Sequence, residues 1–322
     1  MSFSGEVKEE LSRQLSSARH CQLAELSAIV SACGMYSVRP HGRLFLVLQS
    51  ENLLVARKAN LLLRETFDVV PDVSVMGSGD WKKSRVYTLA VRNGDVVTRI
   101  LQATKFMQEN GALIDLELPV SSLLLRTPCC RRAFLRGAFL SMGSISNPEK
   151  SYHFEIVCVS PERAEQLQAL IRTFGLDAKT VQRKKHYIVY IKEGAQIVDM
   201  LNIMEAHVSL MNLENIRIVR EMRNDVNRKV NCEAANINKT VSASVKQMED
   251  IRYLETRQVL DHLPPNLVQI ARLRLENQDA SLKELGEMLV PPVGKSGVNH
   301  RLRKLSRLAE ELRQNKEGYY YD

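Results

Sequence analysis

Two rounds of alternating helix-like and strand-like hydrophobic patterning occupy most of the first 225 residues. Apolar positions three and four residues apart predict helices, and short continuous apolar runs predict buried strands. The first round is predicted to contain helix 23–33, strand 44–48, helix 51–67, strand 86–91 and helix 96–107. The second is predicted to contain helix 133–142, strand 154–159, helix 161–174, strand 187–191 and helix 195–204.

Matching glycines in the two rounds lie at a nearly constant separation. Gly34 and Gly143 differ by 109 positions, and Gly94 and Gly194 differ by 100. An insertion of about ten residues around 77–81 in the first round accounts for the change. The pattern favours an internal duplication with pseudo-two-fold symmetry, and two unrelated α+β stretches of similar rhythm are the alternative.

A separate, all-helical unit is predicted at the C-terminal end of the chain. Leu263-Pro264-Pro265-Asn266 marks its boundary, and three helices follow at 265–277, 282–289 and 296–314. Ser281 and Glu284 have the spacing of a capping box at the start of the second helix. The connection at 290–295 is rich in proline and longer than the usual turn of about 3–4 residues in a helix-turn-helix.

The third of these helices carries apolar residues on one side and cations on the other. Its predicted buried positions are Val298, Leu302, Leu305, Ala309 and Leu312. Between residues 295 and 307 there are five Lys or Arg and no acid. Such a helix can lie in the major groove of DNA, where its first residues contact base edges and lysine neutralises phosphate. The predicted DNA-binding residues are Ser281, Lys295, Ser296, Asn299, His300, Arg303, Lys304 and Arg307. A solvated amphipathic helix is the alternative.

Composition adds a modest preference for a polyanionic partner. The chain is 44% hydrophobic and 25% charged, with a net charge of +8. No apolar signal core opens it, and no run reaches the length of about 18 apolar residues that spans a bilayer, so a cytoplasmic protein without membrane contact is expected.

The six cysteines are too scattered for a disulfide framework. Cys129 and Cys130 are adjacent and no CxxC pair exists, so neither a metal site nor a cofactor is predicted.

Three stretches of the chain resemble the WhiA family of bacterial DNA-binding regulators. They are SFS at 2–4, NCEAANINKT at 231–240 and SGVNHRLRKL at 296–305. The resemblance implies a degenerate LAGLIDADG homing-endonuclease-like domain joined to a C-terminal helix-turn-helix. It also implies a role in sporulation, or in cell division and chromosome segregation, at the nucleoid.

Taken together, the expected fold class is α+β, with a duplicated LAGLIDADG-like α/β domain followed by an all-α helix-turn-helix domain. The expected segments are an N-terminal helical segment 1–19, a duplicated domain 20–230 with halves at about 20–115 and 128–225, a linker helix 231–262 and a helix-turn-helix domain 263–316.

The LAGLIDADG comparison predicts that the chain has lost nuclease chemistry. The motif aligns with LSAIVSACG at 26–34 and with LRGAFLSMG at 135–143. In the endonucleases an acid before each final glycine holds the catalytic metals, and here those positions are Cys33 and Met142. Hard divalent cations need oxygen ligands, which a thiol and a thioether do not supply. No catalytic residue is therefore expected.

The distribution of basic residues over the duplicated domain does not identify its binding partner. The predicted strands carry almost no basic residues, unlike the DNA-binding saddle of the endonucleases. Basic residues cluster instead at the predicted turns 81–85 and 183–186. These turns are candidates for an auxiliary DNA contact, for a protein partner, or for ordinary solvated hairpin tips. A non-enzymatic regulator bound to double-stranded DNA is the leading hypothesis; an active LAGLIDADG-type nuclease and a protein-interaction scaffold are the alternatives.

Overall fold

The computed structural model describes residues 2–38, 44–77 and 85–317, with side chains to residue 314. The chain divides into two compact units, Met1–Glu221 and Met222–Asp322. Each unit has its own hydrophobic core, so the two are described separately. No helix in the described ranges combines the length and the apolar character that crossing a membrane requires.

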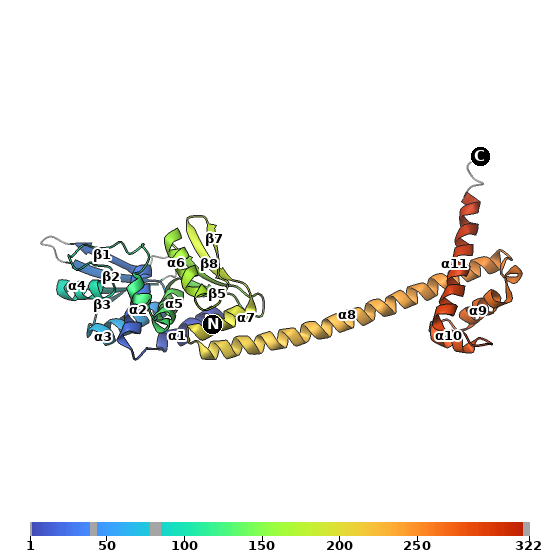
Figure 1. The fold of residues 1–322 in the computed structure, drawn as a ribbon, viewed down its shortest axis with the longest axis horizontal. Coiled ribbons are helices and arrows are strands. Elements are labelled where there is room, and N and C mark those ends of the chain that lie inside the picture. The colour runs from blue at the N-terminus through green and yellow to red at the C-terminus, as the bar shows by residue number, and fades with distance from the viewer. Residues whose placement is uncertain (1, 39–43, 78–84, 318–322) are drawn as a thin grey trace. The chain divides into compact units, whose positions relative to one another are not determined.

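The first unit contains two halves with the same order of elements (Figure 1). After α1 (Phe3–Arg13), the first half consists of α2 (Arg19–Cys33), β1 (Gly34–Val38), β2 (Leu44–Ser50), α3 (Leu53–Phe67), β3 (Asp72–Gly77), β4 (Arg85–Val91) and α4 (Gly94–Ala103). After the short helix η2 (Ser122–Leu125), the second half consists of α5 (Pro128–Met142), β5 (Gly143–Ile145), β6 (Phe154–Cys158), α6 (Pro161–Arg172), β7 (Lys179–Arg183), β8 (His186–Ile191) and α7 (Gly194–Ile203).

Each half forms an antiparallel four-stranded sheet, and the strand orders match. They are β1-β2-β4-β3 and β5-β6-β8-β7. This equivalence confirms the internal duplication. The insertion expected around 77–81 lies mainly outside the described residues, because residues 78–84 are not among them.

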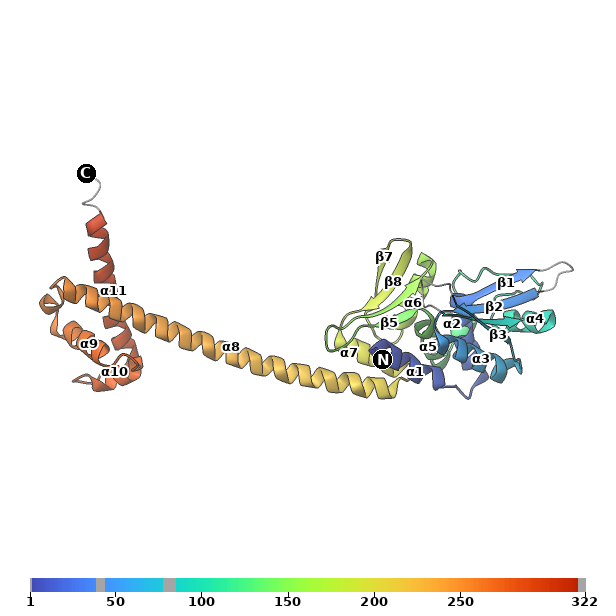
Figure 2. The same ribbon diagram turned by 180° about the vertical axis from the view of Figure 1, so that it is seen from behind.

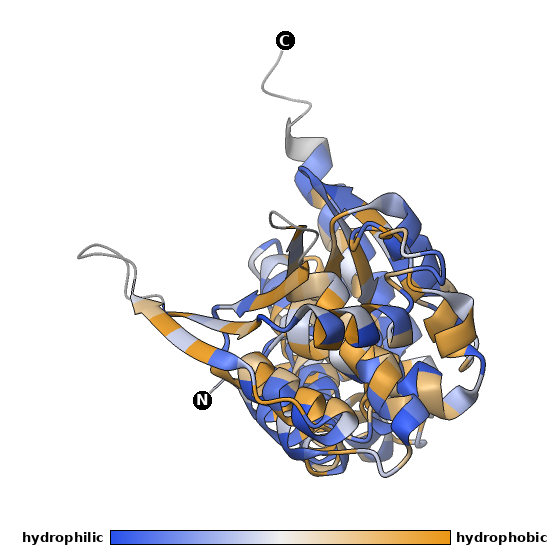
Figure 3. Ribbon diagram, turned by 90° about the vertical axis from the view of Figure 1, so that its left-hand side faces the viewer, coloured by the Kyte–Doolittle hydropathy of each residue, from blue (hydrophilic) through white to orange (hydrophobic). Residues whose placement is uncertain are grey.

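Helices α2 and α5 lie side by side between the two halves (Figure 2). A Cβ atom on Gly137 of α5 would stand 2.5 Å from the carbonyl oxygen of Glu25 in α2, so only glycine permits this approach. One apolar core extends through both halves. Hydrophobic and polar positions alternate along the strands and helices that surround it, as expected for elements with one buried face (Figure 3).

The outer strands were not predicted from the sequence. The inner strands β2, β4, β6 and β8 agree with the predicted apolar runs to within a few residues, whereas β1, β3, β5 and β7 had no predicted counterpart. These four strands are the sheet edges. Every residue of β3 and of β7 is exposed, so neither strand needs the apolar pattern that marks a buried one.

The second unit is a helical domain that includes the larger part of a long helix. Helix α8 (His207–Thr256) crosses the unit boundary and is longer than the predicted linker helix 231–262. It contains neither Gly nor Pro, so nothing in its sequence interrupts it. After it come η3 (Leu260–His262), α9 (Pro265–Glu276), α10 (Leu282–Met288) and α11 (Lys295–Glu317). Ile251 and Leu254 of α8 join the apolar core of α9, α10 and α11.

Candidate nucleic-acid interface

The start of α10 is held by the predicted capping box. The Ser281 hydroxyl accepts a hydrogen bond from the Glu284 amide at 3.3 Å, and the Glu284 carboxylate accepts one from the Ser281 amide at 2.7 Å. The same backbone contact holds the pKa of Glu284 below its ordinary value. The box therefore fixes where this short helix begins.

Close packing at Gly286 sets the path from α10 into α11. The Gly286 carbonyl accepts a hydrogen bond from the amide of Val293 at 2.9 Å. A Cβ atom at Gly286 would stand 2.1 Å from the Val293 carbonyl oxygen. The long proline-containing connection thus folds back against α10 instead of projecting into solvent.

Helix α11 buries the predicted face and exposes the other. Val298, Leu302, Leu305 and Ala309 are at most 1% exposed, and Leu312 is partly buried against the same core. These residues lie at helical spacing, so the opposite side of the helix is presented to solvent.

The predicted DNA-binding residues lie on the solvent side of this unit. Asn299 is half-buried, and the exposed ones are Ser281, Lys295, Ser296, His300, Arg303, Lys304 and Arg307. Within the described ranges, the four cations of this set form no ion pair. Some other cations of the unit are paired, including Lys246 with Glu310 at 3.0 Å and Arg313 with Asp250 at 2.7 Å. The first half of α11 therefore presents unpaired cations to solvent, with no acid between residues 295 and 307.

A groove beside α11 adds residues that the sequence did not single out. Its volume is about 490 Å³, and Ser281, Lys295 and Asn299 line one part of it. The remaining lining includes Lys239, Thr240 and Ser244 of α8, Arg274 of α9 and Lys283 of α10. The end of the 231–240 stretch, first interpreted as a linker, thus lies at the predicted DNA-binding surface. The three asparagines and the lysine of this stretch are the sequence feature that could have indicated a DNA contact there.

Arg274 lines this groove and joins the segments around it by hydrogen bonds. Its guanidinium donates to the Ala280 carbonyl at 2.7 Å and to the Gln247 side chain of α8 at 3.2 Å. The residue is 3% exposed, and burial lowers its pKa. Arg274 therefore acts from within the domain, where it joins α8 and α9 to the segment that precedes α10.

The first unit has no carboxylate at either of the two motif positions expected to carry one. Cys33 and Met142, the last residues of α2 and α5, are both half-buried. Burial raises the pKa of the Cys33 thiol, which favours its neutral form. The nearby cation Lys8 has its pKa lowered to about 8 by burial, and Arg163 donates to the Ser31 carbonyl at 2.9 Å. Neutral sulfur beside cations does not attract a hard divalent cation.

The other acids considered as substitutes are engaged elsewhere. Glu25 is fully buried and accepts from Arg136 and Lys58, each at 3.0 Å. Glu155 pairs with His153 at 3.0 Å. Glu149 is exposed in the turn after β5. None of the three lies at the end of α2 or α5.

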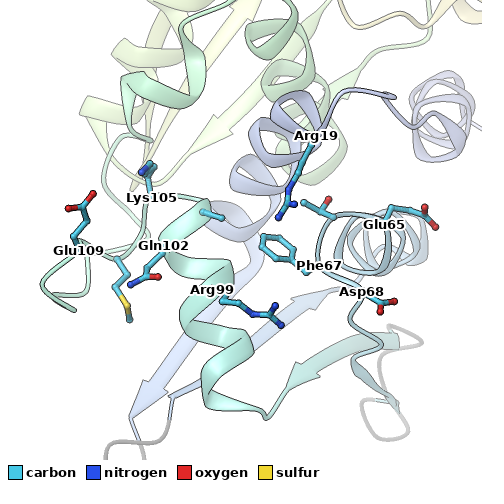
Figure 4. Close-up of a pocket in the computed structure, with 11 residues that line it drawn as sticks. Arg19, Glu65, Phe67, Asp68, Arg99, Gln102, Lys105 and Glu109 are labelled. Carbon is cyan, nitrogen blue, oxygen red and sulfur yellow. The ribbon is translucent and has the colours of Figure 1, made fainter.

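Two other places in the first unit carry positive charge that could be relevant to DNA, a hairpin tip and a pocket. Residues 183–186 form the tight β7–β8 turn, as predicted; residues 81–84 of the other basic turn lie outside the described residues. A pocket of about 750 Å³ mixes the cations Arg19, Arg99 and Lys105 with three acids (Figure 4). Mixed charge gives no strong preference for a polyanion, in contrast to α11.

Comparison with known proteins assigns the same regions to one family. The WhiA N-terminal LAGLIDADG-like domain matches residues 19–107, the WhiA LAGLIDADG-like domain matches 131–223, and the WhiA C-terminal HTH domain matches 226–309. The chain is 52% identical over 315 residues to the probable cell division protein WhiA of Lachnoclostridium phytofermentans, covering 98% of this chain and all of that one. It is 48% identical over 313 residues to the protein of the same name from Clostridium perfringens, covering 97% and 99% of the two chains.

A solved structure agrees at the level of the fold. The crystal structure of full-length WhiA from Thermotoga maritima covers 97% of this chain and 99% of its own, with a TM-score of 0.56 and 24% identity. Its fold, the three domain matches and the two bacterial relatives all lead to one assignment. The chain belongs to the WhiA family, with duplicated LAGLIDADG-like domains followed by a helix-turn-helix domain.

Proposed function

We propose that this protein is a non-enzymatic, sequence-specific DNA-binding regulator that places α11 in the major groove. The observation that carries the proposal is the exposed face of α11, on which Lys295, Arg303, Lys304 and Arg307 form no ion pair among the described residues and no acid lies between residues 295 and 307. A one-signed face on a helix anchored by its opposite side fits a polyanionic double helix.

Position along α11 suggests separate roles for its residues. Ser296, Asn299, His300 and Arg303 occupy the first turns, from which recognition helices contact bases. Lys295, Lys304 and Arg307 are exposed cations suited to phosphate. Ser281 lines the same groove as Lys295 and Asn299, where its exposed hydroxyl can donate to a phosphate oxygen.

The phosphate role is tested by salt dependence. Genome-wide mapping of bound DNA supplies a target duplex, and fluorescence anisotropy measures affinity across salt concentrations. Lys304→Gln should weaken binding to every sequence and reduce the slope of log K against log salt by about 0.9, the value for one phosphate contact. Lys150→Gln, which changes an exposed lysine in the first unit, is the control. An unchanged slope for Lys304→Gln would exclude this face as the DNA contact.

The base-reading role is tested by measuring the preference among DNA sequences, and not by the salt dependence of affinity. Asn299→Ala or Arg303→Ala should reduce discrimination between the target and single-base variants by about 1–3 kcal/mol at the contacted position. If both variants keep the full base preference of the unaltered protein, the assignment of these residues is wrong.

The absence of nuclease activity is proposed from Cys33 and Met142. Each stands at a motif position where metal-dependent cleavage needs a carboxylate oxygen. The test incubates the protein with its mapped target duplex and Mg²⁺ or Mn²⁺. Intact DNA is expected, and specific cleavage that disappears on metal chelation would establish the nuclease alternative.

The cellular role proposed is regulation of cell division and chromosome segregation, or of sporulation, at the nucleoid. The relatives named probable cell division proteins support it. Expression profiling after gene deletion should show altered transcription of genes beside the mapped sites, and a fluorescent fusion should overlap the nucleoid. Bound sites without any change in neighbouring transcription would favour an architectural role.

A further inference from the structure

Three thiols and one imidazole meet where α2 and α5 begin. The residues are His20, Cys21, Cys129 and Cys130, and one ligand atom from each lies within 4.8 Å of all the others. In the part of the chain that the structure describes, this is the one group of three or more His, Cys, Asp or Glu residues that converges in this way. The sequence predicted no metal site, because Cys129 and Cys130 are adjacent and no CxxC pair exists. The two ligand pairs stand more than 100 positions apart, so their spacing gave no sign that they meet.

The cluster follows the internal symmetry of the domain. His20 and Cys129 are the second residues of their helices, and Cys21 and Cys130 are the third. Both pairs are separated by 109 positions, the same offset as Gly34 and Gly143. The pseudo-two-fold packing of α2 on α5 therefore brings a two-residue ligand pair from each half to one point.

Direct contacts already join the four side chains. The His20 Nδ1 atom lies 3.1 Å from the Cys130 sulfur and 3.4 Å from the Cys21 sulfur. The Thr127 hydroxyl lies 3.2 Å from the Cys129 sulfur, and this contact lowers the pKa of that thiol. The start of a helix also stabilises a thiolate, and two helices start here.

We propose that these four residues form a structural zinc site of the Cys₃His type, which links the two halves of the duplicated domain. Zinc prefers four tetrahedral ligands of sulfur and nitrogen, and a Zn–S distance of about 2.3 Å places sulfur atoms about 3.8 Å apart. The present spacing approaches that arrangement without a change in backbone fold. Four protein ligands complete the coordination, so the metal would have no open position for catalysis.

The chemistry of binding is coordination without redox change. Zn²⁺ would bind three cysteine thiolates and the neutral Nδ1 of His20, and three thiol protons would pass to solvent. Affinity should therefore rise with pH, because the cation competes with protons for sulfur.

The first test measures binding in the full-length chain. Protein purified anaerobically and stripped of metal is titrated with Zn²⁺ against a colorimetric chelator, and with Co²⁺ as a spectroscopic probe. One zinc per chain is expected, together with the intense thiolate charge-transfer and visible bands of tetrahedral cobalt. X-ray absorption should show a sulfur-dominated shell at about 2.3 Å. Failure to bind zinc, or an oxygen-only shell, would refute the site.

Variants at the two exposed members separate binding from folding. Cys129→Ser and His20→Ala change exposed side chains, and each should lower zinc affinity by more than the roughly 10- to 100-fold typical of losing a residue that only orients a ligand. Cys232→Ser removes an exposed cysteine of α8 and should leave affinity unchanged. Zinc should also raise the melting temperature of the unaltered protein but not of the Cys129→Ser variant. Equal affinity in all three variants, or a Cys21–Cys130 disulfide in the anaerobic protein, would overturn the proposal.

Discussion

The replacement of Gly286 by alanine tests whether the packing of α10 against its following turn holds the DNA-binding helix in place. The new Cβ atom would stand 2.1 Å from the Val293 carbonyl oxygen and 3.2 Å from a methyl group of Val298. Cβ atoms essentially never approach other atoms closer than 3.0 Å, so the backbone must move by at least about 0.9 Å. Val293 and Val298 lie just before and within the first turn of α11, so the movement passes directly to the residues proposed to read bases.

The expected cost follows from overpacking in a small core. Such changes destabilise a domain by about 1–3 kcal/mol. For a domain of this size each kcal/mol lowers the melting temperature by about 4–8 °C. Target-DNA affinity should fall as well, because phosphate and base contacts depend on one placement of α11.

Gly294→Ala is the matched control for this prediction. It lies in the same connection, and a Cβ atom there would have no other atom within 4 Å. Differential scanning calorimetry and fluorescence anisotropy should therefore distinguish the two alanine variants. A Gly286→Ala protein that melts and binds DNA like the Gly294→Ala protein would refute this account of the turn.

Further predictions concern buried charges. Glu25→Gln leaves the cations Lys58 and Arg136 buried without their shared carboxylate, and it should cost about 3–5 kcal/mol of unfolding free energy in urea titrations; a cost below about 1 kcal/mol would contradict this ion-pair role. Because burial lowers the pKa of Lys8 to about 8 from 10.5, the folded state binds fewer protons in that interval and stability should rise with pH across it. Lys8→Met should remove that rise, and an unchanged pH profile would count against the shift. Arg313→Met leaves the nearly buried Asp250 without its partner; the second unit should lose about 1–3 kcal/mol, measured by its thermal transition, and no loss would show the pair to be inert.

The sequence determined the elements that carry a strong local or periodic signal. The helices around the two motif glycines, the inner strands and the buried face of α11 all follow from apolar spacing. The capping box at Ser281 follows from a three-residue spacing alone. Each signal lies within one helix or one strand, so it is readable without knowledge of the partners.

Tertiary structure decided the features that depend on two distant segments. The edge strands exist because an inner strand offers backbone partners, and exposed strands such as β3 need no apolar pattern. The groove at α11 exists because Lys239 of α8 lies beside residues of α9, α10 and α11, helices that begin 26 or more positions later along the chain. The cluster of His20, Cys21, Cys129 and Cys130 exists because the start of α2 meets the start of α5. A separation of 109 positions along the chain does not indicate how close two residues lie in space. Only the pseudo-two-fold packing of the two helices brings these residues into contact.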